Sequence, residues 1–137
     1  RVANFIAPSV KKYILVDFSK NMIEKAKIRY KDVDNIQFVV NDGRTLKEIP
    51  SKSIDFVFCE LAFQHMEKDN TASYVKEVNR ILIEGKVFLA QMPRFDYYKD
   101  VYAFTKEEVD KIFIDYNKIE YLSYPKEYAY FLIKAIK

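Results

Sequence analysis

Short apolar segments alternate with helical segments through most of the chain, and this alternation constrains the fold more than any other feature. The first segment, at residues 13–17, reads Tyr-Ile-Leu-Val-Asp and shows no polar alternation, which is typical of a strand buried on both faces. Further apolar segments follow at residues 36–41, 54–60 and 86–92. Strands that alternate with helices predict right-handed crossovers and a parallel sheet covered on both faces.

Helices are expected before and between these strands. Residues 2–7 resemble the end of a helix that stops at Pro8, because a proline disfavours helical geometry in the residue before it. Ser19 is a suitable N-cap for a helix that continues to about residue 31, and a further helix is predicted at residues 69–82. The apolar face of the helix after Ser19 is expected to hold Met22, Ile23, Ala26 and Tyr30.

The last third of the chain departs from this order. Thr105 and Glu108 have the spacing of a capping box that opens a short helix. Two strands are expected at residues 118–123 and 128–136, and the turn at 124–127 is too short for a crossover, so they must pair antiparallel. The predicted fold is therefore a doubly wound α/β sheet, mostly parallel, that ends in an antiparallel β-hairpin.

Composition excludes several classes of protein. The net charge is +3, from 23 basic and 20 acidic residues, which gives no support to a dedicated nucleic-acid binder. No apolar run reaches the length of a membrane helix, so no membrane span is predicted. The chain has one cysteine and one histidine, which excludes an internal disulfide, gives little support to a metal site, and predicts a reducing, cytoplasmic location.

The residues that follow each strand are the candidates for a site, because ligands of open parallel sheets bind beyond the carboxyl ends of the strands. Asp17 and Asp42 lie at the ends of two successive predicted strands. The carboxylate of Asp17 can accept from both hydroxyls of a ribose. Asp42 can accept from an exocyclic amine such as that of adenine, while Gly43 allows the backbone to approach the ring. Each acid alone is more often a turn former or a helix cap, but the pair at matching strand ends favours a ligand.

The segment at residues 13–26, Tyr-Ile-Leu-Val-Asp-Phe-Ser-Lys-Asn-Met-Ile-Glu-Lys-Ala, resembles the second strand and following helix of small class I methyltransferases that use S-adenosylmethionine. This resemblance implies a Rossmann-like fold and methyl transfer to an acceptor that the sequence does not identify. A small molecule is the favoured acceptor, while nucleic acid and protein substrates stay open, as does the oligomeric state. The likeness continues in family order through residues 38–43, 53–66, 77–82, 85–89 and 104–109.

The resemblance assigns roles to individual residues. Asp17 would hold the ribose hydroxyls of the cofactor S-adenosylmethionine, and Asp42 would face its adenine amine. The backbone of Gly43 would lie near that ring. The adenosine pocket would be lined by Phe18 and Met22, and the methionine portion of the cofactor would lie beside Cys59, Glu60 and Leu61.

Candidates for the catalytic step are Glu60 and His65, and neither is assigned uniquely. Glu60 can take the proton of an acceptor, but an exposed loop carboxylate fits the sequence equally well. For His65, the only histidine, a structural or pocket-lining role is favoured over that of a general base. Cys59 is interpreted as an inert buried thiol. Aromatic contacts with the acceptor, or anchoring of a loop, are expected from Tyr97, Tyr98 and Tyr102.

The chain departs from the family at its start. Family members begin with a strand and a glycine-rich turn, and the resemblance places that strand between those ending at Asp17 and Glu60. Nothing at the start of the sequence matches it, so residues 1–137 are expected to form a single methyltransferase-like domain that is incomplete at its N-terminus. Two rival functions stay open: a non-catalytic partner or scaffold subunit, which would not bind cofactor, and a nicotinamide-dependent oxidoreductase, which also sets an acid against ribose.

Overall fold

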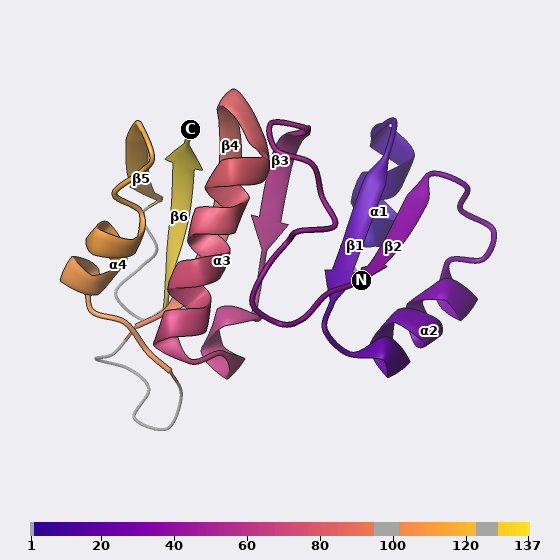
Figure 1. Ribbon diagram of the computed structural model, residues 1–137, viewed down its shortest axis with the longest axis horizontal. Helices are drawn as coiled ribbons and strands as arrows, with labels where there is room; N and C mark the ends of the chain where they lie inside the picture. The colour runs from indigo at the N-terminus through magenta and orange to yellow at the C-terminus, as the bar shows by residue number, and fades with distance from the viewer. Residues whose placement is uncertain (1, 95–101, 123–128) are drawn as a thin grey trace. The chain divides into compact units, whose positions relative to one another are not determined.

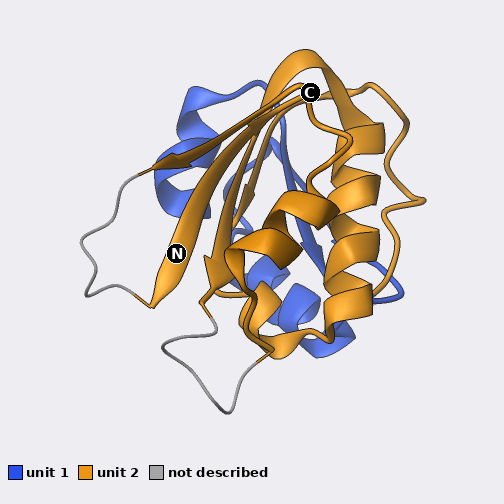
Figure 2. Cartoon of the chain, turned by 90° about the vertical axis from the view of Figure 1, so that its left-hand side faces the viewer, with its two compact units in different colours: residues 1–43 blue, residues 44–137 orange. Residues whose placement is uncertain are grey.

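The structure is a computed structural model that describes residues 2–94, 102–122 and 129–137. The chain divides into two compact units, residues 1–43 and residues 44–137 (Figure 2). Each unit has its own strands and its own buried apolar side chains. The expectation of a single domain over residues 1–137 stays a prediction.

The first unit is built around two parallel strands (Figure 1). Strand β1 (Tyr13–Asp17) pairs in register with β2 (Ile36–Val40), and helix α2 (Lys20–Arg29) connects them. Before β1 lie the short helix α1 (Ala3–Ile6) and the 3-10 helix η1 (Ala7–Ser9). The strand–helix–strand order predicted from the apolar segments is therefore confirmed.

Helix α2 begins as the sequence predicts. The side chain of Ser19 accepts a hydrogen bond from the amide of Met22, at 3.3 Å, and so caps the first turn. Ile23 and Tyr30 are buried in the core of this unit, but Met22 is 51% exposed. Of the predicted apolar face, Met22 therefore does not join the core.

The α-helix expected at residues 2–7 ends at Ile6, before Pro8, but Pro8 does not stop the helical backbone. Ala7, the residue before Pro8, has helical torsion angles of φ −54° and ψ −41°, and the chain continues through Pro8 as the 3-10 helix η1. The physical reason is that Pro8 lies in the first turn of a new helix, where its missing N–H would have no intrahelical partner. The backbone becomes extended only at Val10.

The second unit contains a four-stranded sheet in the order β3-β4-β6-β5 (Figure 1). Its first two strands pair in parallel, and its last strand in sequence pairs antiparallel with both neighbours. This confirms the antiparallel hairpin, although the turn predicted at residues 124–127 lies outside the described residues. The elements are β3 (Ile54–Cys59), η2 (Phe63–His65), α3 (Lys68–Ile81), β4 (Leu82–Pro93), α4 (Lys106–Ile112), β5 (Lys118–Leu122) and β6 (Tyr130–Ile136).

The core of the second unit lies on one face of this sheet. Phe88 on β4 is fully buried, and its ring stacks on Phe113 at 5.8 Å between centroids. Tyr116 completes the cluster, and its hydroxyl donates to the carbonyl of Val75 on α3 at 3.0 Å. The cluster therefore helps to pack the sheet against α3.

Strand β4 begins earlier than expected, at Leu82 rather than at residue 86. Its register with β3 shifts between Ile54 and Phe56, which adds the extra residues at its start. Gly85 adopts a positive φ of 75°, and its amide donates to the carbonyl of Lys137 at 2.8 Å. This hydrogen bond to the residue that follows β6 helps keep the segment within the strand.

Candidate functional site

The carboxyl ends of β1 and β2 lie side by side. Asp17 is opposite Val40 in the ladder, and the amide of Asn41 donates to the carbonyl of Asp17 at 3.2 Å. Because the two strands are parallel, the residues that follow them emerge at the same edge of the sheet. Asp17 and the segment 41–43 are therefore neighbours, as the sequence predicts.

The carboxylate of Asp17 is held in a fixed orientation. Its Oδ1 accepts a hydrogen bond from the amide of Ser19 at 2.8 Å, so the side chain turns back over the start of α2. Among the residues that the structure describes, its Oδ2 accepts no hydrogen bond. A half-buried carboxylate with one oxygen anchored and one available can accept from hydroxyl groups of a ligand.

Two large apolar side chains that follow Asp17 in the sequence are exposed. Phe18 is 72% exposed, and Met22, in the first turn of α2, is also exposed. Gly43 has a positive φ of 75°, and a Cβ on it would lie 3.5 Å from Cβ of Phe18. Asn41 is buried, and its Oδ1 accepts from the amide of Gly43 at 3.4 Å. Asp42 is exposed beside this turn.

These residues form a strand-tip cluster, defined as Asp17, Phe18, Met22, Asp42 and Gly43. It combines two carboxylates with apolar surface that is left to solvent and a glycine that keeps the backbone accessible. Carboxylates accept from hydroxyl and amine donors, while apolar surface covers a flat ring. The cluster can therefore bind a small molecule that joins a polyol to an aromatic base.

The predicted residues of the second unit follow β3. Cys59 ends the strand opposite Ala90, and burial raises the pKa of its thiol to about 12, which agrees with an inert role. Glu60 is exposed. Leu61 has a positive φ of 57°, which is unusual for a residue other than glycine, and its amide donates to Oε1 of Gln91 at 3.0 Å.

Two side chains near His65 were not found from the sequence. The Nε2 atoms of His65 and Gln64 are 2.9 Å apart, and Oε1 of Gln64 accepts from the hydroxyl of Tyr130 at 2.5 Å. Tyr130 is on β6, 66 positions from Gln64. No local pattern links the two residues, and only the antiparallel return of β6 brings them together.

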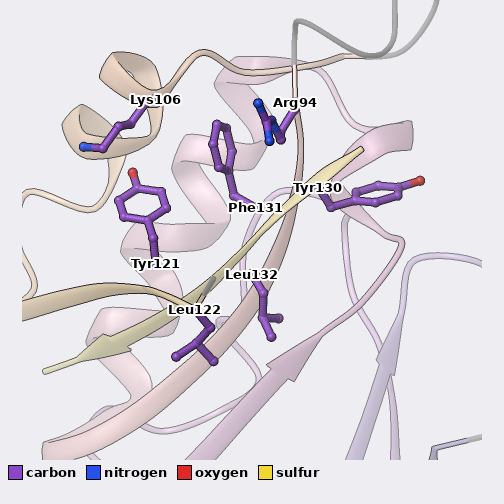
Figure 3. A pocket seen from close by; sticks show the side chains of 7 residues that line it. All are labelled: Arg94, Lys106, Tyr121, Leu122, Tyr130, Phe131 and Leu132. Carbon is purple, nitrogen blue, oxygen red and sulfur yellow. The ribbon is translucent and has the colours of Figure 1, made fainter. Parts of the chain in front are cut away.

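A cavity of about 260 Å³ opens in the second unit beside the carboxyl end of β4 (Figure 3). The guanidinium of Arg94 lies over the ring of Phe131, 5.2 Å from its centroid. Tyr102 is exposed, whereas Tyr97 and Tyr98 lie outside the described residues. The cavity is lined by Arg94, Lys106, Tyr121, Leu122, Tyr130, Phe131 and Leu132.

The structure thus gathers the predicted residues in two sets, one in each unit. The strand-tip cluster belongs to the first unit, while Cys59, Glu60, Leu61 and His65 follow β3 in the second. Within the described parts of the chain, no group of three acidic, histidine or cysteine side chains could hold a metal ion. A helix long and apolar enough to cross a membrane is likewise absent from those parts.

Comparison with known proteins identifies the family. A family model described as a methyltransferase domain matches residues 1–90, and the chain belongs to this family. The resemblance inferred from residues 13–26 and the segments after them is thereby confirmed, as is the Rossmann-like α/β fold.

Individual relatives agree with this assignment. The chain is 36% identical, over 70 residues, to a demethylmenaquinone methyltransferase of Staphylococcus saprophyticus, a match that covers 51% of this chain and 29% of that protein. An S-adenosylmethionine-dependent methyltransferase from Clostridium acetobutylicum superposes with a TM-score of 0.80 at 13% identity, covering 98% of this chain and 78% of the other. A protein of Pyrococcus horikoshii gives a TM-score of 0.73 at 20% identity, with 99% and 76% covered. The chain thus spans less than a third of the curated relative that it matches.

Proposed function

We propose that this protein transfers a methyl group from S-adenosylmethionine to a small-molecule acceptor. The observation that carries the proposal is the strand-tip cluster, where Phe18 lies against Gly43 beside the anchored carboxylate of Asp17. Membership of the methyltransferase family supports the same activity.

The residues of the cluster fit an adenosine group. Asp17 would accept from the ribose hydroxyls through its available oxygen, and Asp42 would accept from the adenine amine. Phe18 and Met22 would cover the ring, which explains why two large apolar side chains are left exposed. Gly43 carries no Cβ on the side of Phe18, so its backbone stays accessible to a flat ring beside that phenylalanine.

The segment after β3 is assigned the rest of the cofactor. Cys59, Glu60 and Leu61 would lie along its methionine portion, and the strained backbone at Leu61 supports a role for this turn in binding. When bound, S-adenosylmethionine supplies an electrophilic methyl group on a sulfonium. The chain then has to hold and orient the acceptor, and positioning alone can contribute about 7–11 kcal/mol to such a step.

Glu60 is our candidate for taking the proton of the acceptor. It is exposed at the end of β3, whereas the thiol of its neighbour Cys59 stays protonated because burial raises the pKa. A general base is needed only when the methyl-accepting atom carries a proton, so methyl transfer does not require a catalytic dyad.

A small organic acceptor is supported by the name of the curated relative, which acts on demethylmenaquinone. The balanced charge of the chain, +3 overall, gives no support to a polyanionic substrate. The single cysteine favours a reducing compartment, so we place the activity in the cytoplasm.

Isothermal titration calorimetry with S-adenosylhomocysteine tests the proposal. The protein is expected to bind this demethylated product of the cofactor, and Asp17→Ala is expected to abolish the heat while the fold stays intact by circular dichroism. A nicotinamide dinucleotide run in parallel is expected to give no heat. Absence of both heat and thermal shift with S-adenosylhomocysteine would favour the non-catalytic scaffold instead.

A further inference from the structure

Three side chains of the second unit form a continuous hydrogen-bonded chain. The hydroxyl of Tyr130 contacts Oε1 of Gln64 at 2.5 Å, and the amide nitrogen of the same glutamine contacts Nε2 of His65 at 2.9 Å. The glutamine therefore uses both ends of its side-chain amide, one toward β6 and one toward the imidazole.

The direction of each bond follows from the chemistry of its groups. Oε1 of Gln64 is an acceptor, so the hydroxyl of Tyr130 must donate to it. The amide nitrogen of Gln64 is a donor, so Nε2 of His65 must receive the bond through its lone pair. In a neutral imidazole that accepts at Nε2, the proton is on Nδ1. An unrestrained histidine prefers the opposite tautomer, with the proton on Nε2.

Both ends of this hydrogen-bonded series of side chains are anchored. Phe63, next to Gln64, is buried and packs edge-to-face on Phe88. Tyr130 is the first residue of β6 and is paired with Pro93 of β4, so the sheet holds the backbone that carries the phenol ring. The backbone amide of His65 donates to the carbonyl of Ala62 at 3.0 Å, so the backbone that carries the imidazole is also held in place. A local rotation of Gln64 would break contacts at both ends of its amide.

We infer that Tyr130, acting through Gln64, holds the neutral imidazole of His65 as the Nδ1–H tautomer and so makes it a hydrogen-bond donor, not a base. Tyr130 and Gln64 are positioning residues in this inference. His65 is exposed, and among the described residues its Nδ1 contacts no polar side chain, so this N–H is available to a ligand.

The inference narrows the class of methyl acceptor, and in this part it rests on the proposed function. An N–H donor at Nδ1 favours a methyl acceptor that carries a carbonyl or carboxylate oxygen, because such an oxygen can accept this hydrogen bond. Nε2 cannot take a proton from substrate while Gln64 donates to it. The proton of the acceptor would therefore pass to Glu60 and not to His65.

Because the chain has one histidine, its tautomer can be read directly by long-range ¹H–¹⁵N correlation spectroscopy at alkaline pH. We expect the Nδ1–H form to predominate in the parent protein. Tyr130→Phe removes only the hydroxyl, and we expect the majority form to change to Nε2–H. Gln64→Glu places a pure acceptor beside the ring, which requires a proton on Nε2 and should give the same change.

Tyr121→Phe is the matched control. Tyr121 lies on β5, its hydroxyl donates to Oδ1 of Asp110 at 2.7 Å, and its ring points to the other side of β6 from that of Tyr130 (Figure 3). This variant should leave the tautomer unchanged. A parent protein with mainly Nε2–H, or a Tyr130→Phe protein identical to the parent, would overturn the inference.

The measurement needs no cofactor, so its failure is separate from failure of the calorimetry with S-adenosylhomocysteine. If Tyr130→Phe melts early, Gln64→Glu decides the outcome, because this change is at a partly exposed side chain that does not contribute to the core. An unchanged Nδ1–H tautomer in Gln64→Glu would contradict the inference as well.

Discussion

Phe18 packs against Gly43 across the tips of two parallel strands, and a Cβ built on Gly43 would stand 3.5 Å from Cβ and 3.8 Å from Cγ of that phenylalanine. These are ordinary van der Waals distances, so a methyl group would fit beside the ring. The positive φ of 75° at Gly43 is the stricter requirement, because side chains rarely adopt it. The turn thus selects glycine for its backbone, and the bare backbone then faces the site.

Replacing Gly43 by alanine should therefore weaken both stability and ligand binding. The strained backbone is expected to lower the free energy of unfolding by about 1–2 kcal/mol. Gly85→Ala is the matched control, since Gly85 has the same φ of 75° with nothing within 4 Å of its Cβ position. Both variants should lose stability in urea titrations, but only Gly43→Ala should lose affinity for S-adenosylhomocysteine. Equal affinities in the two variants would argue against the strand-tip cluster.

Asp17→Asn should weaken binding of S-adenosylhomocysteine while leaving the fold intact. The change keeps an oxygen that can accept from Ser19 but replaces the available carboxylate oxygen with a donor. Hydrogen bonds to a charged group contribute about 1.5–3 kcal/mol, so we expect Kd from calorimetry to rise roughly 10- to 150-fold. Asp55→Asn removes an exposed carboxylate that pairs with Lys86 and should leave Kd unchanged.

Arg80 holds the segment after the first unit against α3. Its guanidinium binds both carboxylate oxygens of Glu77, at 2.8 and 2.9 Å, and also donates to the carbonyls of Leu46 and Ile49. Lysine cannot reproduce this planar fork. Arg80→Lys should therefore lower the free energy of unfolding by about 1–3 kcal/mol in urea titrations. Arg29→Lys, at an exposed position of α2, should stay within about 0.5 kcal/mol of the parent.

The fold was predictable wherever a local pattern decides the structure. The apolar segments became β1, β2 and β3 within one residue of their expected ends, because a short unbroken run of β-formers favours a strand. The burial expected for them was wrong, since Val39 alone among the residues of these three strands is buried. The Thr105 and Glu108 spacing became a capping box, since both of its hydrogen bonds are local. Because the ends of β1 and β2 were predicted correctly, the placement of Asp17 beside residues 41–43 was predictable as well.

What could not be predicted depends on contacts between distant residues. The Tyr130–Gln64 bond joins positions 66 apart, and the early start of β4 depends on hydrogen bonds to Lys137. Helical backbone continues through Pro8 as the 3-10 helix η1, because the proline lies in the first turn of that helix. Residue spacing in the sequence carries no signal for any of these.

Stability should fall in acid partly through Glu108. Hydrogen bonds from Lys68, at 2.6 Å, and from the amide of Thr105 hold the pKa of this carboxyl below its ordinary value near 4.5. A depressed folded pKa gives stability that is present above the unfolded pKa and is lost as the pH falls through the folded pKa. Melting temperatures of the parent should therefore decline more steeply below about pH 4.5 than those of Glu108→Gln. Glu107→Gln makes the same charge change in the same turn without these partners, and it should keep the parent slope.

Cys59 should react slowly with thiol reagents while the protein is folded. Burial raises the pKa of its thiol to about 12, so the reactive thiolate is scarce at pH 8. Against an ordinary thiol with a pKa near 8.5, the thiolate fraction falls by roughly three orders of magnitude. Labelling by iodoacetamide, followed by mass spectrometry, should be slower by about that factor in buffer than in denaturant. Because this cysteine is the only one in the chain, a single rate reports on it. Equal rates in both solvents would mean that the thiol is solvated and ionisable, and Cys59 would then become a candidate nucleophile beside Glu60.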